Sequence, residues 1–405
     1  MNTYEIVLLL SGGVIISYIF NLIAKKFAIP SVLLLLGTGI LVGQVFGQNL
    51  LPTTFVNKTV EILGVVGLIM IILEASLDLE LSQDKSKMIA QAFFAALLIL
   101  LASSFSIALI IQQATGETFR NCLVYATPMS IISSAIVIPS VENLLPHKRE
   151  FIIYEASFSD ILGILFFNYL IAEEGISLES GIMYGFNIVW SLLLSVVVAL
   201  GLIYLLSRIT LHLKYFLLFA VLLVLYAAGK LLHLPSLLII LFFGLFINNR
   251  KIIRPKIIVE GVPQHMFDEV ENNLKSITAE TAFLIRTFFF ILFGYSMNVS
   301  IFSQEEVWGT GSMVVLALLV IRFIFLRFIQ SQKNTMPELL LMPRGLITIL
   351  LFYSIPQQFK LNTFNNGILF FVILITSVLM MFGIMTAEKK GNSSSFNDEA
   401  IGEIV

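Results

Sequence analysis

The feature that most constrains this chain is a series of apolar segments, each long enough to cross a lipid bilayer. A membrane-spanning helix needs roughly 20 apolar residues, and about 13 segments approach that length. A membrane barrel would instead show alternating apolar and polar residues. The sequence therefore predicts an all-α, polytopic membrane protein. The expected spans are residues 4–24, 29–47, 60–79, 88–111, 121–142, 150–171, 182–207, 213–231, 234–249, 277–299, 307–330, 337–357 and 364–387.

Composition supports a membrane setting. Charged residues make up only 12% of the chain, against about 25% in soluble domains. The single cysteine, Cys122, excludes a disulfide or a multi-thiolate metal site within one chain. No phosphate-binding loop occurs, so we expect no nucleotide partner. We also expect no nucleic-acid partner and no bound cofactor. An ion gradient is then the expected energy source.

The basic residues predict how the chain is oriented. With the N-terminus outside, 17 of the 24 Lys and Arg residues fall in cytoplasmic connections and 4 in outer ones. This is the positive-inside pattern, and it places the C-terminus in the cytoplasm. We expect a plasma (inner) membrane location. We also expect a surface helix within residues 250–276 and a disordered tail after Lys390.

Two of the expected spans contain helix-breaking residues. Pro128 and Pro139 lie in the fifth span, and Pro343 and Gly345 lie in the twelfth. If six spans, one odd span and six further spans form inverted repeats, these two spans correspond. Paired broken helices predict a binding site near the membrane midplane. The alternative is that proline only kinks the two helices.

A few charged residues lie inside expected spans, where each costs at least about 2.5 kcal/mol at a helix centre. Asp160 has no Lys or Arg near it in sequence, so its carboxylate must bind a cation or take up a proton. Its alternative role is to join two helices by hydrogen bonds. Arg322 stays charged in the membrane and needs an acidic partner, for which Glu155 is the best candidate. Snorkelling to the surface is the alternative for Arg322.

Other polar residues have less specific patterns. Arg344 follows Pro343 and is either regulatory or a boundary charge. Glu74 and Asp78 end the third span, where they either form an acidic funnel for cations or are solvated. Hydroxyls in the fifth span either ligate Na⁺ or pack helices together. Glycines 39, 43 and 47 predict close helix packing. The hydroxyl residues are Thr127, Ser130, Ser133, Ser134 and Ser140.

These motifs, in this order, resemble the monovalent cation–proton antiporters and especially their Na⁺/H⁺ exchanger branch. The family signature Glu-Ser-x-x-Asn-Asp reads Glu-Ala-Ser-Phe-Ser-Asp at residues 155–160. The family's Asp-Pro is Thr127-Pro128 here. Arg322 matches the membrane arginine of the family, and residues 343–351 resemble its Arg-Gly signature. The phenylalanine-rich segment at 286–299 and the glycine-rich segment at 29–47 also match.

The resemblance implies a homodimer in the lipid bilayer, with a scaffold and a mobile core. The expected scaffold comprises residues 1–79 and 211–299, and the core comprises 86–171 and 305–387. Residues 182–207 would link them, and 388–405 would be a cytoplasmic tail. Asp160 would bind Na⁺ and H⁺ in turn, with Ser157, Ser159 and Thr127 nearby. Glu155 and Arg322 would form a structural ion pair.

The expected function is therefore secondary antiport of Na⁺ or Li⁺ for H⁺, and we expect it to be electroneutral. The departures from the signature, Ala156, Ser159 and Thr127, leave K⁺/H⁺ antiport open as an alternative. A solute carrier of the same fold with an organic-anion substrate is another. No catalytic motif accompanies the four histidines, so we expect no enzyme activity. No filter-like loop favours a channel.

Overall fold

A computed structural model describes most of the chain. It describes residues 3–27, 31–47, 52–79, 81–141, 144–171, 214–231, 236–249, 264–297, 299–329, 335–361 and 363–402, with scattered residues between 183 and 201. Throughout these ranges the regular elements are helices, with no strand. The prediction of an all-α chain is thus confirmed. The chain divides into unit 1, residues 1–57, 90–163 and 290–405, and unit 2, residues 58–89 and 164–289.

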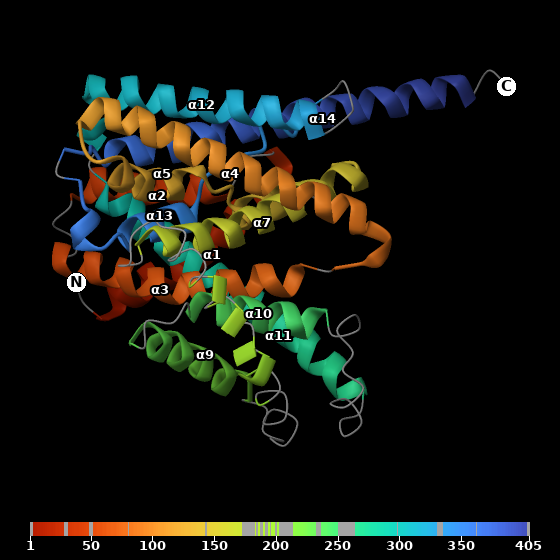
Figure 1. Cartoon of the computed structure of the whole chain (residues 1–405), viewed down its shortest axis with the longest axis horizontal. Helices are drawn as coiled ribbons and strands as arrows, with labels where there is room; N and C mark the ends of the chain where they lie inside the picture. Colours follow the sequence, from red (N-terminus) through yellow and green to blue (C-terminus); the bar gives the residue numbers. More distant parts are fainter. Residues whose placement is uncertain are drawn as a thin grey trace. The chain divides into compact units, whose positions relative to one another are not determined.

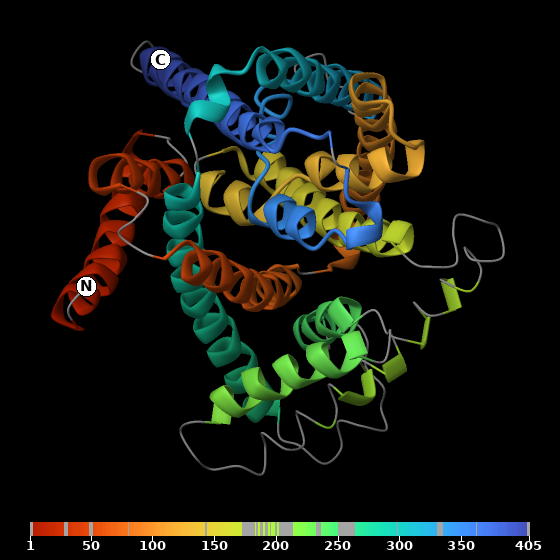
Figure 2. The same cartoon turned by 90° about the vertical axis from the view of Figure 1, so that its left-hand side faces the viewer.

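Unit 1 is built largely from long apolar helices that enclose shorter, buried ones. Helices α12 and α14 lie side by side, and the short helix α13 packs against α5 (Figures 1 and 2). Helices α1 and α2 are also neighbours. The helices with most of their residues in this unit are α1 (Thr3–Phe27), α2 (Ser31–Phe46), α4 (Ser86–Thr115), α5 (Phe119–Ser130), α6 (Ser134–Ser140), α7 (Pro146–Ile171), α12 (Glu305–Ile329), α13 (Leu346–Tyr353) and α14 (Gly367–Gly402), with the 3₁₀ turns η2 (Val299–Ser303) and η3 (Gln357–Phe359).

Unit 2 contains most of α3 (Thr53–Asp78), α9 (Lys214–Leu231), α10 (Ser236–Asn248), most of α11 (Gln264–Ser296) and the 3₁₀ turn η1 (Gln83–Lys85). Helix α9 packs against α10. The linking span expected at 182–207 lies almost entirely outside the described residues. The first half of the segment 250–276 also lies outside them. Its second half is helical, and it continues into the next span as the single helix α11.

Six described helices are long and apolar enough to cross a membrane, which agrees with a multi-pass membrane protein. They correspond to Thr54–Asp78, Ser86–Thr115, Phe119–Ser140, Glu271–Ser296, Glu305–Phe328 and Gly367–Thr386. The tail prediction is wrong in part, because α14 continues as a helix to Gly402. Extending a helix that already exists costs much less than starting one, and that favours helix even in a polar sequence.

Glycines allow α2 and α11 to approach closely, as the glycine pattern predicts. A side chain added at Gly39 would collide with the main chain at Ile291 and Tyr295, and one at Gly294 would collide with the main chain of Leu36. Both contacts lie within unit 1. Close approach of two backbones is what small residues permit in membrane helices.

Both spans with helix-breaking residues are interrupted, as the sequence predicts. In the fifth span, α5 ends at Ser130 and α6 begins at Ser134. In the twelfth, only Leu346–Tyr353 is α-helical, and the preceding residues form turns at 336–340 and a segment without regular secondary structure at 341–345. The expected helical start of this span is therefore wrong. Pro337 and Pro343 supply no backbone N–H there, which disfavours a continuous helix.

Candidate functional site

The interruption between α5 and α6 leaves backbone groups that need partners inside unit 1, and a buried N–H is almost always hydrogen-bonded. Three successive backbone N–H groups at the break donate to groups outside α5 and α6. The Ile132 N–H donates to Ser159 Oγ at 2.9 Å, and the Ser133 N–H donates to the Pro343 carbonyl at 3.0 Å. The Ser134 N–H donates to Asp160 Oδ2 at 3.1 Å. The two broken spans therefore meet, and α7 supplies side chains to their junction.

Asp160 lies at the centre of this junction and is 2% exposed. Its Oδ2 accepts both the backbone N–H of Ser134 and the Ser134 hydroxyl, the latter at 2.5 Å. Its Oδ1 is buried and has no hydrogen-bond partner among the described residues. A buried carboxylate oxygen without a donor can be satisfied by a cation or by a proton. Asp160 is thus placed for either kind of binding.

The other predicted ligands are buried, but their hydrogen bonds differ. The Ser159 hydroxyl accepts a hydrogen bond from the Ile132 N–H, in the break between α5 and α6. The Thr127 hydroxyl donates to the Leu123 carbonyl one turn earlier in α5, at 2.8 Å. Ser157 is 1% exposed. Ser134, one of the five fifth-span hydroxyl residues that the sequence offered as possible Na⁺ ligands, is the residue bonded to Asp160. Its place between Pro128 and Pro139 in a hydroxyl-rich span was the signal that could have singled it out.

The predicted pair between Glu155 and Arg322 is present and fully buried. Arg322 Nη1 and Nη2 donate to Glu155 Oε1 and Oε2 at 2.6 and 2.9 Å. Each residue is 1% exposed, so snorkelling of Arg322 does not occur. The fork-to-fork geometry is the strong form of this ion pair. The pair joins α7 to α12, and its α7 member, Glu155, precedes Asp160 by five residues.

A second ion pair adjoins the first, and the sequence had not indicated it. Glu338, 1% exposed, has both carboxylate oxygens 2.8 Å from Lys148 Nζ. Its main-chain carbonyl accepts Arg322 Nε at 2.8 Å. An acidic residue directly after Pro337, inside an expected span, was the signal that could have found it.

Arg344 is a buried residue that joins the two broken spans. It is 1% exposed, so it is not a solvated boundary charge. Its guanidinium donates to the carbonyls of Met129 at 2.8 Å, Ser130 at 3.2 Å, and Met342. Met129 and Ser130 end α5, where carbonyls lack intrahelical partners. A cation at a helix C-terminus also interacts favourably with the helix dipole.

The two predicted funnel residues belong to unit 2. Glu74 Oε1 is 3.2 Å from Arg286 Nη2, and both side chains are largely buried. Asp78 is exposed at the end of α3. Within unit 2, therefore, Glu74 is paired whereas Asp78 faces outward.

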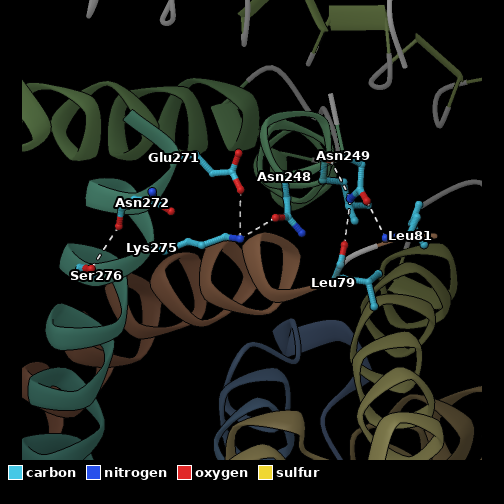
Figure 3. Close-up of polar contacts among 9 residues, drawn as sticks. Leu79, Leu81, Asn248, Asn249, Glu271, Asn272, Lys275 and Ser276 are labelled. Atoms are coloured by element: carbon cyan, nitrogen blue, oxygen red, sulfur yellow. Dashed lines mark hydrogen bonds and ion pairs between the residues drawn. The ribbon is translucent and has the colours of Figure 1, made fainter. Parts of the chain in front are cut away.

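A polar cluster fixes the segment that follows Asp78. Asn249 donates to the carbonyls of Leu79 at 2.8 Å and Leu245 at 3.0 Å, and its Oδ1 accepts the Leu81 N–H at 2.6 Å (Figure 3). Beside it, Lys275 donates to Asn248 Oδ1 at 2.6 Å and to Glu271 Oε1 at 3.2 Å (Figure 3). The end of α3 is thereby tied to α10, and the start of α11 to α10.

The comparisons with known proteins agree with this geometry. The family model described as "Sodium/hydrogen exchanger, transmembrane" matches residues 12–387. A structure of the sodium proton antiporter MjNhaP1 from Methanocaldococcus jannaschii at pH 8 matches with a TM-score of 0.67 and 18% identity, over 96% of this chain and 99% of that one. An electron-microscopy structure of the same antiporter matches with a TM-score of 0.65 and 17% identity, over 96% and 97%. At such identities the likeness concerns the fold. Among curated protein sequences, none matches.

Proposed function

The chain belongs to the sodium/hydrogen exchanger family, and from this premise we propose that it exchanges Na⁺ or Li⁺ for H⁺, one for one, by alternating access. Its family supports the coarser statement that it is a membrane cation/proton antiporter and not an enzyme. The choice of Na⁺ or Li⁺, the one-for-one ratio and the residues that bind the ion are our proposal.

One observation supports the proposal above all others, namely the two unlike oxygens of Asp160. Oδ2 holds two hydrogen bonds from Ser134, whereas Oδ1 is buried without a partner in the described part of the chain. A lone carboxylate oxygen can hold a small cation or a proton but not both, so the two ions compete. Hard monovalent cations prefer such oxygen ligands. Competition for one carboxylate is sufficient to couple the cation flux to the proton flux, and no second binding site is needed.

We assign the remaining roles around this residue. Ser157, Ser159 and Thr127 surround the ion with hydroxyl groups, and Glu155 with Arg322 holds α7 in place. The core, residues 86–171 and 305–387, moves against a scaffold of 1–79 and 211–299 within a homodimer. The broken spans 121–142 and 337–357 correspond as members of inverted repeats. The protein lies in the plasma (inner) membrane, with its N-terminus outside and its C-terminus in the cytoplasm.

The test compares wild type with Asp160→Asn in proteoliposomes that carry an internal pH dye. Asparagine keeps the size of the side chain but cannot take up a proton at neutral pH. We expect wild type to dissipate a pH gradient when Na⁺ or Li⁺ is added, and the variant not to respond. Ser140→Ala is the matched control, because in the described part of the chain the Ser140 hydroxyl bonds within its own helix, to the Ile136 carbonyl.

Each other result contradicts a stated part of the proposal. A wild-type response to K⁺ alone contradicts the Na⁺ assignment and leaves the mechanism in place. No response to any of the three cations over a broad pH range contradicts cation exchange, and uptake of organic acids is then the next assay. A fully active Asp160→Asn variant contradicts the site and makes Asp160 structural.

A further inference from the structure

Glu338 connects two charged side chains that reach it from different helices. Its carboxylate binds Lys148, from the first turn of α7, through both oxygens at 2.8 Å. Its main-chain carbonyl binds Arg322, from α12, at 2.8 Å. Lys148 also donates to the Met336 carbonyl at 3.0 Å. One turn of chain, residues 336–340, is therefore held from both sides by cations.

These contacts form a closed ring with α7. Lys148 and Glu155 are seven residues apart, which is two turns of a helix, so they lie on the same face of α7. Lys148 reaches Glu338 directly, and Glu155 reaches it through Arg322. The ring contains two positive side chains and two negative ones in alternation, and their charges sum to zero. In order they are Lys148, Glu338, Arg322 and Glu155. Charges that are paired in this way are the form in which buried ionic groups are tolerated.

The turn held by this ring leads directly into the junction of the broken spans. Residues 341–345 follow it as a segment without regular secondary structure. Within that segment, the Pro343 carbonyl accepts the N–H of Ser133, and the next residue, Ser134, bonds to Asp160. Asp160 lies on α7, twelve residues after Lys148. The position of the 336–345 segment along α7 therefore sets the position of Ser133 and Ser134 against Asp160.

We propose that Lys148 and Glu338 are a positioning pair, which fixes the 336–345 segment along α7 and so sets the geometry of the ion site at Asp160. This inference rests on the proposed exchange of cations for protons. It differs from the role of Glu155 and Arg322, because that pair joins α7 to α12 and touches the 336–340 turn only through a main-chain carbonyl. The Lys148–Glu338 pair is the side-chain ion pair between α7 and the turn itself.

The Lys148–Glu338 pair differs from the Arg322–Glu155 pair because one of its side chains, that of Lys148, is partly exposed to solvent. The Lys148 side chain is 20% exposed and that of Glu338 only 2%. Replacing Lys148 therefore leaves a buried carboxylate without its cation, whereas replacing both residues by glutamine leaves no uncompensated charge. The double variant is thus the one expected to fold most readily.

The experiment uses the full chain in proteoliposomes with Na⁺ as the probe. Lys148→Gln, Glu338→Gln, the double variant and Lys148→Arg are compared for the Na⁺ concentration at half-maximal exchange and for the maximal rate. Misplacement of a site by an ångström can cost up to about a hundredfold. For the two single variants and the double variant we expect the half-maximal concentration to rise by about tenfold or more, with a smaller change in the maximal rate. The double variant should be no worse than either single one, because all three lose the same contact.

Lys148→Arg should restore a near wild-type value, since arginine can also bind both oxygens of Glu338. The matched control is Lys275→Gln, which breaks the ion pair of Lys275 with Glu271 in unit 2. It should leave the half-maximal concentration unchanged.

The positioning role is overturned if the glutamine variants lower the melting temperature in detergent but keep the wild-type half-maximal concentration. It is equally overturned if Lys275→Gln produces the same change as Lys148→Gln. If the single variants do not fold, the double variant alone is tested. A raised half-maximal Na⁺ concentration then supports the positioning role, and a wild-type value overturns it. A wild-type protein that exchanges no cation contradicts the proposed function instead, so the two failures are distinct.

Discussion

Ser134 binds Asp160 with two donors from one residue, its backbone N–H and its hydroxyl. Both donate to Oδ2, at 3.1 and 2.5 Å. Hydrogen bonds donated to a carboxylate favour its charged form over its protonated form. The charged form is the one that binds a cation. If Asp160 binds both ions as proposed, Ser134 is thereby placed to set the balance between cation and proton at this residue.

Ser134→Ala removes the hydroxyl donor and leaves the backbone donor in place. We expect the protonated form of Asp160 to gain relative to the charged one, because only the charged form used the lost hydrogen bond. Exchange should then need a higher pH, so the activity profile shifts toward the alkaline side by about one unit, the equivalent of a hydrogen bond of about 1.4 kcal/mol. The pH profile of exchange in proteoliposomes measures this. An unshifted profile contradicts the assigned role.

Glu155 and Arg322 lead to a prediction about stability. Glu155→Gln leaves the Arg322 guanidinium buried without its counter-charge, and such a loss costs about 3–5 kcal/mol. We expect a lower melting temperature in detergent. Adding Arg322→Met to this variant removes the unpaired charge and should recover part of the loss. A double variant that is less stable than Glu155→Gln contradicts this account of the pair.

At the scale of elements, the junction depends on how closely the two broken spans pack. Gly345 directly precedes α13 as its N-cap, and its backbone φ of −152° is one that any residue can adopt. Space is the constraint, because an added Cβ would lie 2.6 Å from both Ser133 Oγ and Ile136 Cδ1. Real side chains essentially never pack so tightly, and overpacking forces backbone shifts. Glycine at this position lets α13 and the break between α5 and α6 meet.

Gly345→Ala should therefore displace Ser133 and its neighbour Ser134 from their positions beside α7. We expect exchange to fall by about a hundredfold, since displacements of about 1 Å can have that effect. Gly37→Ala is the matched control, because an added Cβ there meets no atom within 4 Å. Exchange rates of the two variants, normalised to the amount of folded protein, give the comparison. Equal rates would mean that the junction tolerates a methyl group.

The sequence predicted the elements better than it predicted their contacts. Apolar length and proline position were sufficient for the two interruptions and for most of the described helices, because lipid requires satisfied backbones and proline cannot satisfy one. They did not predict the late start of α13 or the continuation of α14 to Gly402. The partner of Arg322 was predictable, since a buried arginine requires an acid. Ser134 was predicted only as one of five possible hydroxyl ligands, without its bond to Asp160, and Glu338 was not predicted as a site residue. Their roles depend on which segments meet at the breaks, and hydrophobic periodicity carries no information about that.

Arg344 illustrates the same limit. Its position after Pro343 is compatible with a residue at the membrane boundary. Its burial follows from two carbonyls at the end of α5 that need donors. These two carbonyls need outside donors only because α5 ends inside unit 1. The hydrophobic segment continues past that point, so its length does not indicate where α5 ends.

At the scale of the whole molecule, the buried charges of unit 1 bear on the stoichiometry of exchange. Glu155 pairs with Arg322 and Glu338 with Lys148, so these four contribute no net charge. Arg344 contributes one positive charge that does not change during the cycle. Among the buried charged residues that the structure describes, Asp160 is then the group available to alternate between ions. It is neutral with a bound proton and equally neutral with a bound monovalent cation.

Under the proposed function, in which Asp160 binds either ion, both loaded forms would carry the same net charge across the membrane in opposite directions. A full cycle would then move one cation one way and one proton the other way, with no net transfer of charge. We expect proteoliposomes under Na⁺ and H⁺ gradients alone to show exchange without a steady current. Parallel recording of current and dye signal on one preparation gives the measurement, and Asp160→Asn provides the baseline. A sustained current that depends on Na⁺ would require a second titrating group in the cycle and would contradict this charge balance.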